Sequence, residues 1–160
     1  PADAAEQTLA RLNKLEGRNG EYAQDVANDM RAAMQQHAGV FRTQASMDEG
    51  VRKIAAIRER VNAIGLKDTS KVFNTARIEA LEVENLIEAA QATMVSAAAR
   101  KECRGAHTVS DYERPADDPV APLGRNDAEW MKHTLWYSEG NRLDYKPVTI
   151  TKHQPLARSY

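Results

Sequence analysis

The residues best suited to chemistry lie close together near position 105 of the chain. Cys103 and His107 are four residues apart, so a continuous helix would place both side chains on one face. A thiol beside an imidazole can act as a Cys–His nucleophile pair, and the same two groups can form half of a zinc site. Gly105 disfavours a continuous helix between them, and the sequence nearby offers neither a second His/Cys pair nor a recognisable orienting group. A structural role for both side chains is therefore preferred.

The glycines do not support phosphate-binding chemistry. No two of the eight glycines stand at G-x-G spacing, so a Rossmann fingerprint and a P-loop are both absent. The chain by itself is therefore expected to bind no dinucleotide. Four glutamates and a basic stretch are interpreted as solvent-facing sides of helices, and not as acid–base or phosphate sites: Glu79, Glu82, Glu84, Glu88 and residues 52–60.

Four helices are predicted to position these residues, because apolar side chains recur every three or four positions up to about residue 104. The predicted helices cover residues 2–16, 21–38, 46–64 and 74–104, and each is followed by a glycine that can end it: Gly17, Gly39, Gly65 and Gly105. The apolar stripes of the first and fourth helices include Leu9, Leu12, Leu15, Ile78, Leu86, Ile87 and Met94.

Two of these helices carry starting signals. Ser46 and Glu49 have the spacing of a capping box, and Asn74 can cap the fourth helix. His37 lies on the apolar side of the second helix, where a hydrogen-bonded, half-buried histidine is expected. Caps, stops and periodicity together predict a mainly α fold: an antiparallel helical bundle of three long helices plus an N-terminal helix.

The C-terminal third has a different composition, because every proline except Pro1 lies at position 115 or later. Since proline interrupts helices, we divide the chain into a helical bundle, residues 1–106, and a loop-rich extension, residues 107–160, that packs on the bundle as one structural unit. Within the extension we expect an irregular loop over 111–124 and a short helix over 127–133. A small hairpin is expected from strands at 135–137 and 145–151, with Gly140 between them.

Composition restricts the class of protein further. The 160 residues include 22 Lys+Arg and 23 Asp+Glu, a net charge of -1 that disfavours nucleic-acid binding. No apolar run approaches the roughly 20 residues of a membrane span, and no signal peptide is recognisable. The single cysteine fits a reducing compartment. Pro1 stands where an initiator Met is expected, which indicates a piece of a longer chain.

A series of short motifs resembles the C-terminal region of the flavoprotein subunit of the succinate dehydrogenase/fumarate reductase family. The most specific block is Arg100-Lys-Glu-Cys-Arg104-Gly-Ala-His107, with Trp130-Met-Lys-His133-Thr134 after it. Other pieces follow the family's order along the whole chain: Met34 to His37, Val40-Phe41-Arg42, Phe73-Asn74-Thr75, Leu81-Glu82, Asn85-Leu86, Asp111-Tyr112, Asp144 to Val148 and Arg158-Ser159-Tyr160. Two positions depart from the family: Cys103 stands at a usual serine, and Val109 at a usual arginine that Arg114 could replace.

The resemblance implies that this segment is the C-terminal helical domain of a parent enzyme that oxidises succinate to fumarate with FAD. Electrons would pass through an iron–sulfur subunit to quinone. The family's catalytic and FAD-binding residues precede this region, so the segment is expected to hold no cofactor and to be inactive alone. Its partners would be the upstream flavin and capping domains and the iron–sulfur subunit, with no nucleic acid and only indirect membrane contact. The location implied is the cytoplasmic face of the bacterial inner membrane, or the mitochondrial matrix face.

The segment's own task is then structural, and four residues are candidates for contacts with the rest of the subunit or its partners: Arg104, His107, Trp130 and His133. Arginine can make buried bidentate contacts, and tryptophan is common at the centre of interfaces. Two alternatives stay open: a free-standing helical-bundle interaction module without enzymatic activity, and a thiol or metal enzyme that uses Cys103 and His107.

Overall fold

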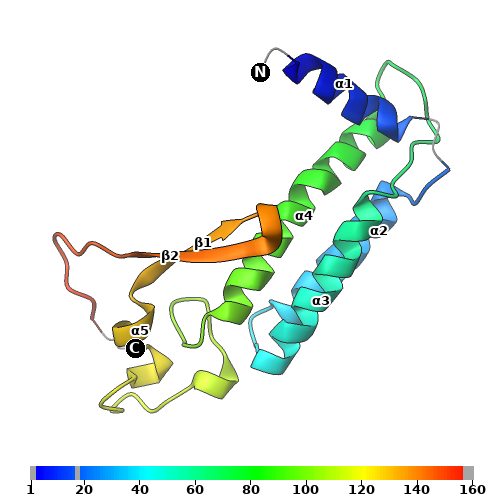
Figure 1. Cartoon of the computed structure of the whole chain (residues 1–160). Coiled ribbons are helices and arrows are strands. Elements are labelled where there is room, and N and C mark those ends of the chain that lie inside the picture. Colours follow the sequence, from blue (N-terminus) through cyan, green and yellow to red (C-terminus); the bar gives the residue numbers. More distant parts are fainter. Residues whose placement is uncertain (1–2, 17–18, 157–160) are drawn as a thin grey trace.

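The fold is mainly helical, and it ends in a small antiparallel hairpin (Figure 1). The computed structural model describes residues 3–16 and 19–156. Its elements are the helices α1 (Ala4–Leu15), α2 (Ala23–His37), α3 (Gln44–Val61), α4 (Thr75–Ala99) and α5 (Asp127–Trp130), and the strands β1 (Lys132–Tyr137) and β2 (Arg142–Pro147). The predicted fold class is confirmed.

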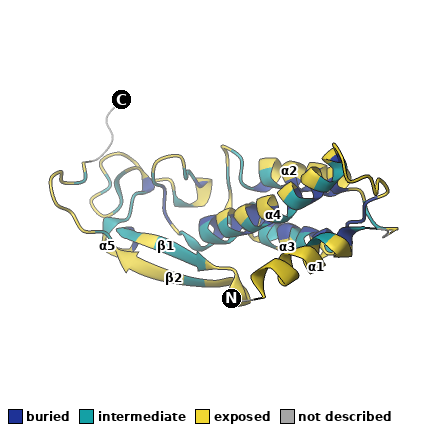
Figure 2. Cartoon of the chain, turned by 90° about the horizontal axis from the view of Figure 1, so that it is seen from above, coloured by how far each residue is buried: buried dark blue, intermediate teal, exposed yellow. Residues whose placement is uncertain are grey.

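Helices α2, α3 and α4 form the bundle, running up and down beside one another with their buried residues on the facing sides (Figures 1 and 2). The core is made of the apolar residues that recur at helical spacing: Val26, Met30, Ile54, Ile57, Val61, Val83, Ile87 and Met94. Gly50 lets the helices approach closely, because a Cβ there would lie 2.6 Å from the Cβ of His37 and 2.7 Å from the sulfur of Met94. The antiparallel bundle is therefore held by close apolar packing.

Helix α1 contributes much less to the core than its apolar stripe suggested. It lies across one end of the bundle, and only Leu15 is buried there, whereas Leu9 is 58% exposed. The end of α1 is joined to the bundle by the Leu66 N–H, which donates to the Leu15 carbonyl at 2.9 Å. Its stripe stays exposed because no other described element covers that side. The predicted stop at Gly17 lies outside the described residues.

The start of α3 and the end of α4 differ from the prediction. Helix α3 begins at Gln44, because the Thr43 hydroxyl oxygen accepts the Ser46 N–H at 3.2 Å and so caps the helix three residues before the predicted cap at Ser46. Ser46 instead lies inside the helix, with its hydroxyl 3.1 Å from Nδ1 of His37. Helix α4 ends at Ala99 and not at residue 104, since Arg100 already has extended backbone. The predicted cap by Asn74 is confirmed, with its side-chain oxygen accepting the Arg77 N–H at 2.9 Å.

The extension, residues 107–160, follows the end of α4 and contains the β1–β2 hairpin, with β1 against α4 (Figure 2). The strands pair antiparallel from Lys132↔Pro147 to Tyr137↔Arg142. Gly140, with φ of +69°, lies in the turn that joins them. The hairpin is confirmed, although the strands cover 132–137 and 142–147, because pairing outward from this turn sets their register. No helix among the described residues combines the length and the apolar character that crossing a membrane requires.

Candidate functional site

The end of α4 is joined to the extension through Glu102, whose side chain has 0% solvent exposure. One carboxylate oxygen accepts hydrogen bonds from Arg100 Nη1 at 2.5 Å and from Arg104 Nε at 2.8 Å. The other accepts from Arg104 Nη2 at 3.0 Å and from the Asn126 backbone N–H at 2.9 Å. A carboxylate out of water is stable only when it is paired and hydrogen-bonded. Two guanidinium groups and one amide meet that requirement here.

Arg104 extends this network to α5. Its Nη2 donates to Asp127 at 2.6 Å, and Arg125 donates to the other oxygen of the same carboxylate at 2.7 Å. Burial alone would raise the pKa of Asp127, but the hydrogen bonds from both arginines outweigh it and hold that pKa below its usual range. The hydrogen bond with Glu102 in turn raises the pKa of Arg104. The three residues 102, 104 and 127 therefore form one charged unit that fixes the extension.

Arg100 extends the network to the hairpin. Its Nη1 donates to the Trp130 carbonyl at 3.0 Å, and its Nη2 donates to the Lys132 carbonyl at 2.8 Å. The guanidinium also lies 5.1 Å from the centroid of the buried Trp130 ring, and the Lys132 ammonium lies 4.5 Å from that centroid. Tyr145 of β2 meets the same ring edge-on at 5.9 Å. The Trp130 ring thus packs against one residue of each strand and against Arg100, and these contacts hold the hairpin beside the end of α4.

His107 connects the extension to the loop between α2 and α3. Its Nδ1 lies 3.1 Å from Nη1 of Arg42, and its Nε2 lies 3.1 Å from the Arg100 carbonyl. Arginine can only donate and a carbonyl can only accept, so Nδ1 carries the lone pair and Nε2 the proton. Burial, with the positive charges of Arg42 and Arg100, lowers the pKa of His107. The imidazole is therefore neutral, and both of its nitrogens are occupied.

The same geometry leaves no Cys–His pair. The Cys103 thiol donates to the Val109 carbonyl at 3.3 Å and accepts the Val109 N–H at 3.4 Å, while its own N–H donates to the Gly124 carbonyl at 2.8 Å. The thiol is buried, and the nitrogens of His107 bond to other groups. Among the residues the structure describes, no three His, Cys, Asp or Glu side chains gather where they could hold a metal ion. Cys103 therefore acts here as a packing residue.

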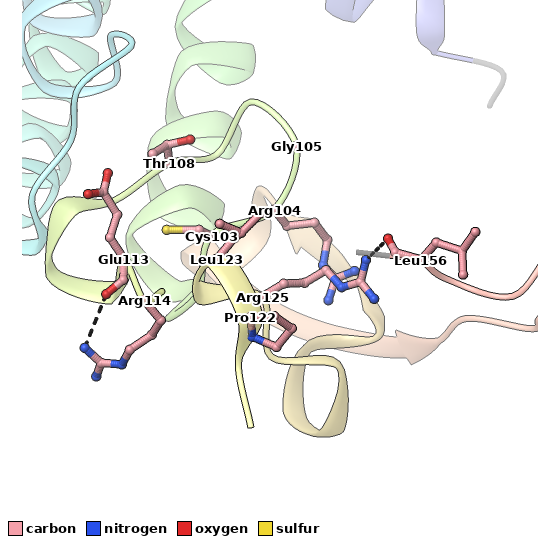
Figure 3. A pocket seen from close by; sticks show the side chains of 10 residues that line it. All are labelled: Cys103, Arg104, Gly105, Thr108, Glu113, Arg114, Pro122, Leu123, Arg125 and Leu156. Carbon is pink, nitrogen blue, oxygen red and sulfur yellow. Dashed lines mark hydrogen bonds between the residues drawn. The ribbon is translucent and has the colours of Figure 1, made fainter. Parts of the chain in front are cut away.

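The Cys103 side chain forms part of the wall of a cavity of about 450 Å³ under the extension (Figure 3). The lining combines three arginines and one acid with apolar and small residues: Cys103, Arg104, Gly105, Thr108, Glu113, Arg114, Pro122, Leu123, Arg125 and Leu156. Arg125 donates to the carbonyl of Leu156, which holds the end of the described chain beside the cavity. Arg104 and Arg125 already share Asp127, so most of the charge of this lining is compensated inside the chain.

His133 lies apart from the network, on the exposed side of β1 opposite Lys146. It borders an open depression of about 360 Å³ whose lining joins the last turn of α4 to β1: Ser96, Ala97, Arg100, His107, Lys132, His133 and Thr134. The structure thus brings Arg104, His107 and Trp130 together through Arg100 and Glu102, and places His133 at the edge of the same region.

Two central residues were not selected from the sequence as functional candidates. Arg100 and Glu102 hold the network together, but the sequence indicated only that they belong to the motif from Arg100 to His107. A usable signal was present, because an acid lies between arginines two residues away on each side just after a helix end. Val109, one of the two positions expected from the sequence to depart from the family, is fully buried against Met47, Ala97 and Ala98. Arg114 is exposed and donates only to the neighbouring Glu113 carbonyl at 3.3 Å.

Comparison with known proteins identifies the family of this chain. The family described as fumarate reductase flavoprotein C-term matches residues 27–160 of the chain. The chain belongs to this family. The family match runs from residue 27, inside α2, to residue 160, so it includes Glu102, both arginines that bind it, and the hairpin.

Relatives in this family carry both enzyme names. The succinate dehydrogenase flavoprotein subunit of Rickettsia bellii is 42% identical over 93% of this chain and 24% of its own length. The fumarate reductase flavoprotein subunit of Haemophilus influenzae is 38% identical over 98% of this chain and 25% of its own. The FrdA chain of an E. coli quinol fumarate reductase superposes with a TM-score of 0.81 at 33% identity, covering 95% of this chain and 25% of FrdA. The chain therefore spans about a quarter of the length of the relatives it matches.

Proposed function

We propose that this chain is the C-terminal helical domain of a flavoprotein subunit that interconverts succinate and fumarate with FAD, and that its own role is structural. The observation that carries the proposal is the family match over residues 27–160. The side chains of the Glu102 network support a structural role, because their charges pair with one another in ion pairs that join the bundle to the extension. In this proposal residues 1–106 and 107–160 form one unit, FAD is held upstream, and the isolated segment is inactive.

The proposed partners are those of a multi-subunit electron-transfer complex. The upstream flavin and capping domains of the same subunit would cover part of the bundle and extension, and an iron–sulfur subunit would pass electrons toward quinone. Support comes from the names of the relatives, which are flavoprotein subunits, and from the likeness to a chain of a quinol fumarate reductase. The membrane would be met only through other subunits, at the bacterial cytoplasmic face or the mitochondrial matrix face. The near-zero net charge argues against nucleic acid as a partner.

The surface proposed to meet these partners is the outer side of the network around Arg104 and His133. Arg104 keeps 29% of its side chain exposed, and His133 is exposed at the edge of the depression beside α4. The Arg104 backbone N–H donates to the His107 carbonyl at 2.8 Å, and His107 lines the same depression as His133. The exposed part of the Arg104 guanidinium and the His133 imidazole can donate hydrogen bonds to backbone carbonyls of a neighbouring domain.

The test compares three alanine variants in the intact subunit: Arg104→Ala, His133→Ala and the control Arg114→Ala. Arg104→Ala should lower flavin content and complex assembly, partly by loosening the extension. His133→Ala should reduce assembly alone, since the His133 side chain is exposed and the chain's own stability should stay unchanged. Arg114→Ala replaces an exposed arginine of the same extension and should change neither. If flavin content, stability and assembly are all unaltered by Arg104→Ala and His133→Ala, the proposal is wrong.

A further inference from the structure

Three exposed apolar side chains lie on the loop between α3 and α4 and on the first turn of α4, at the end of the bundle opposite the Glu102 network. Val72 is 72% exposed, Phe73 is 98% exposed, and Ile78 on the first turn of α4 is 55% exposed. We call these three residues the Phe73 patch. Phe73 and Ile78 also line one open depression of about 400 Å³. Large apolar side chains gathered on a surface in this way mark a contact site more often than scattered ones do.

The backbone at Phe73 indicates that this exposure is maintained against local preference. Its φ is +54°, in the left-handed region that bulky residues rarely adopt. The residue therefore combines an unfavourable backbone conformation with an almost fully solvated aromatic ring. Strained conformations of this kind cluster at sites of binding.

The loop that presents Phe73 is braced from behind. Asn74 is buried, and its Nδ2 donates to the carbonyls of Asp68 and Ser70, both at 2.9 Å. The Asp68 carboxylate accepts the Ser70 N–H at 2.8 Å, which lowers the pKa of Asp68. These bonds hold the loop in one shape, so little conformational entropy remains to be lost when the ring is bound.

The position of the patch indicates which partner it meets. The loop follows Leu66, which is hydrogen-bonded to Leu15 at the end of α1, and Arg77 beside the patch forms an ion pair with Glu16. The chain thus enters the bundle at this end (Figure 1). The chain covers 24% of the Rickettsia bellii relative and matches a C-terminal family, so about three quarters of such a subunit would precede it. A tethered domain reaches the nearest surface at high effective concentration.

We propose that the Phe73 patch inserts into an apolar pocket on the portion of the same subunit that precedes this segment. The inference rests on the proposed function, and it names a second docking point that is distinct from the Arg104 and His133 surface. The two points lie at opposite ends of α4, whose 25 residues span roughly 37 Å. Contacts at both ends would fix the orientation of the bundle against the preceding domain.

The experiment compares amide hydrogen exchange over residues 67–74 in the 160-residue chain and in the full-length subunit. If the patch docks, exchange should be slower in the full-length protein by roughly tenfold or more, the scale expected for burying a phenylalanine ring. Phe73→Asn should abolish that protection. In the 160-residue chain the same variant should leave the melting temperature unchanged or raised, because asparagine tolerates the left-handed conformation. Val120→Asn, at a loop residue that is 78% exposed, should leave the exchange unaltered in both proteins.

Two results would overturn the proposal. Equal exchange rates in the two wild-type proteins would show that the patch does not dock, while the Arg104 and His133 variants still test the proposed function separately. Alternatively, the 160-residue chain could self-associate in sedimentation experiments, lose this association in Phe73→Asn, and show no protection of the loop in the full-length subunit. The occupant would then be a second copy of the chain.

Discussion

Removing the buried carboxylate of Glu102 should strongly destabilise the contact between the bundle and the extension. Glu102→Ala leaves the guanidinium groups of Arg100 and Arg104 with their main partner gone, and these side chains are only 15% and 29% exposed. Four hydrogen bonds to the carboxylate are lost at the same time. Breaking a buried ion pair from one side costs about 3–5 kcal/mol, which is a large part of the roughly 5–15 kcal/mol that stabilises a domain.

The assay is urea unfolding of the 160-residue chain, followed by tryptophan fluorescence because Trp130 lies beside the network. With a slope near 2 kcal/mol per molar urea, a loss of about 4 kcal/mol lowers the midpoint by about 2 M. Glu102→Gln keeps the shape and removes the charge. The amide NH2 group of the new side chain would also face the N–H donors of the arginines, where it can make no hydrogen bond. This variant should therefore lose at least about 2 kcal/mol of the free energy of unfolding.

The matched control is Glu113→Ala, an exposed acid of the same extension, which should change the free energy of unfolding by no more than about 0.5 kcal/mol. A Glu102→Ala loss below about 1 kcal/mol would refute the reasoning. It would mean that the arginines are satisfied equally well by the carbonyls of the hairpin and by water, and that the carboxylate is not what holds the extension.

Two further predictions concern the ends and the middle of the bundle. The free energy of unfolding should be constant above about pH 6.5 and fall below it, because His107 takes up a proton near its ordinary pKa of 6.5 when unfolded but only at lower pH when folded. His107→Gln should reduce this pH dependence of the free energy of unfolding, as measured by urea titrations between pH 5 and pH 8. Gly50→Ala should destabilise by about 1–3 kcal/mol although alanine favours helices, because the added Cβ would press on His37 and Met94. Thermal unfolding measures that effect, and an increase in melting temperature would show that the helices can move apart at no cost.

Local patterns were sufficient to predict the elements of the bundle. The spacing of Val26 and Met30, and of Ile54 and Ile57, marks the faces that α2 and α3 bury. The periodicity of an amphipathic helix depends only on sequence, so these residues could be assigned without a structure. The hairpin could be predicted in the same way, from strand-forming residues on either side of Gly140.

The boundaries and the site could not be predicted in this way. Ser46 and Thr43 are both good capping residues, and which one caps α3 depends on where the chain leaves α2. Ile78 and Leu86 continue the apolar pattern of α4 but are exposed, because other residues of α4, such as Val83 and Ile87, form the face that enters the core. Helix α4 stops at Ala99, and the residues that follow bind distant parts of the chain: Arg100 donates to the Lys132 carbonyl, and Glu102 accepts the Asn126 N–H.

The sequence by itself determined that the chain is a helical bundle with a proline-rich extension, that it carries no glycine cradle for a dinucleotide, and which family it resembles. These properties follow from residue types and short-range spacing. Only the tertiary structure decided that Glu102 is buried between Arg100 and Arg104, that His107 is neutral between Arg42 and a carbonyl, and that the Phe73 ring is left in solvent. The reason is physical, because burial and charge pairing depend on residues far apart in the chain, which meet only after it has folded.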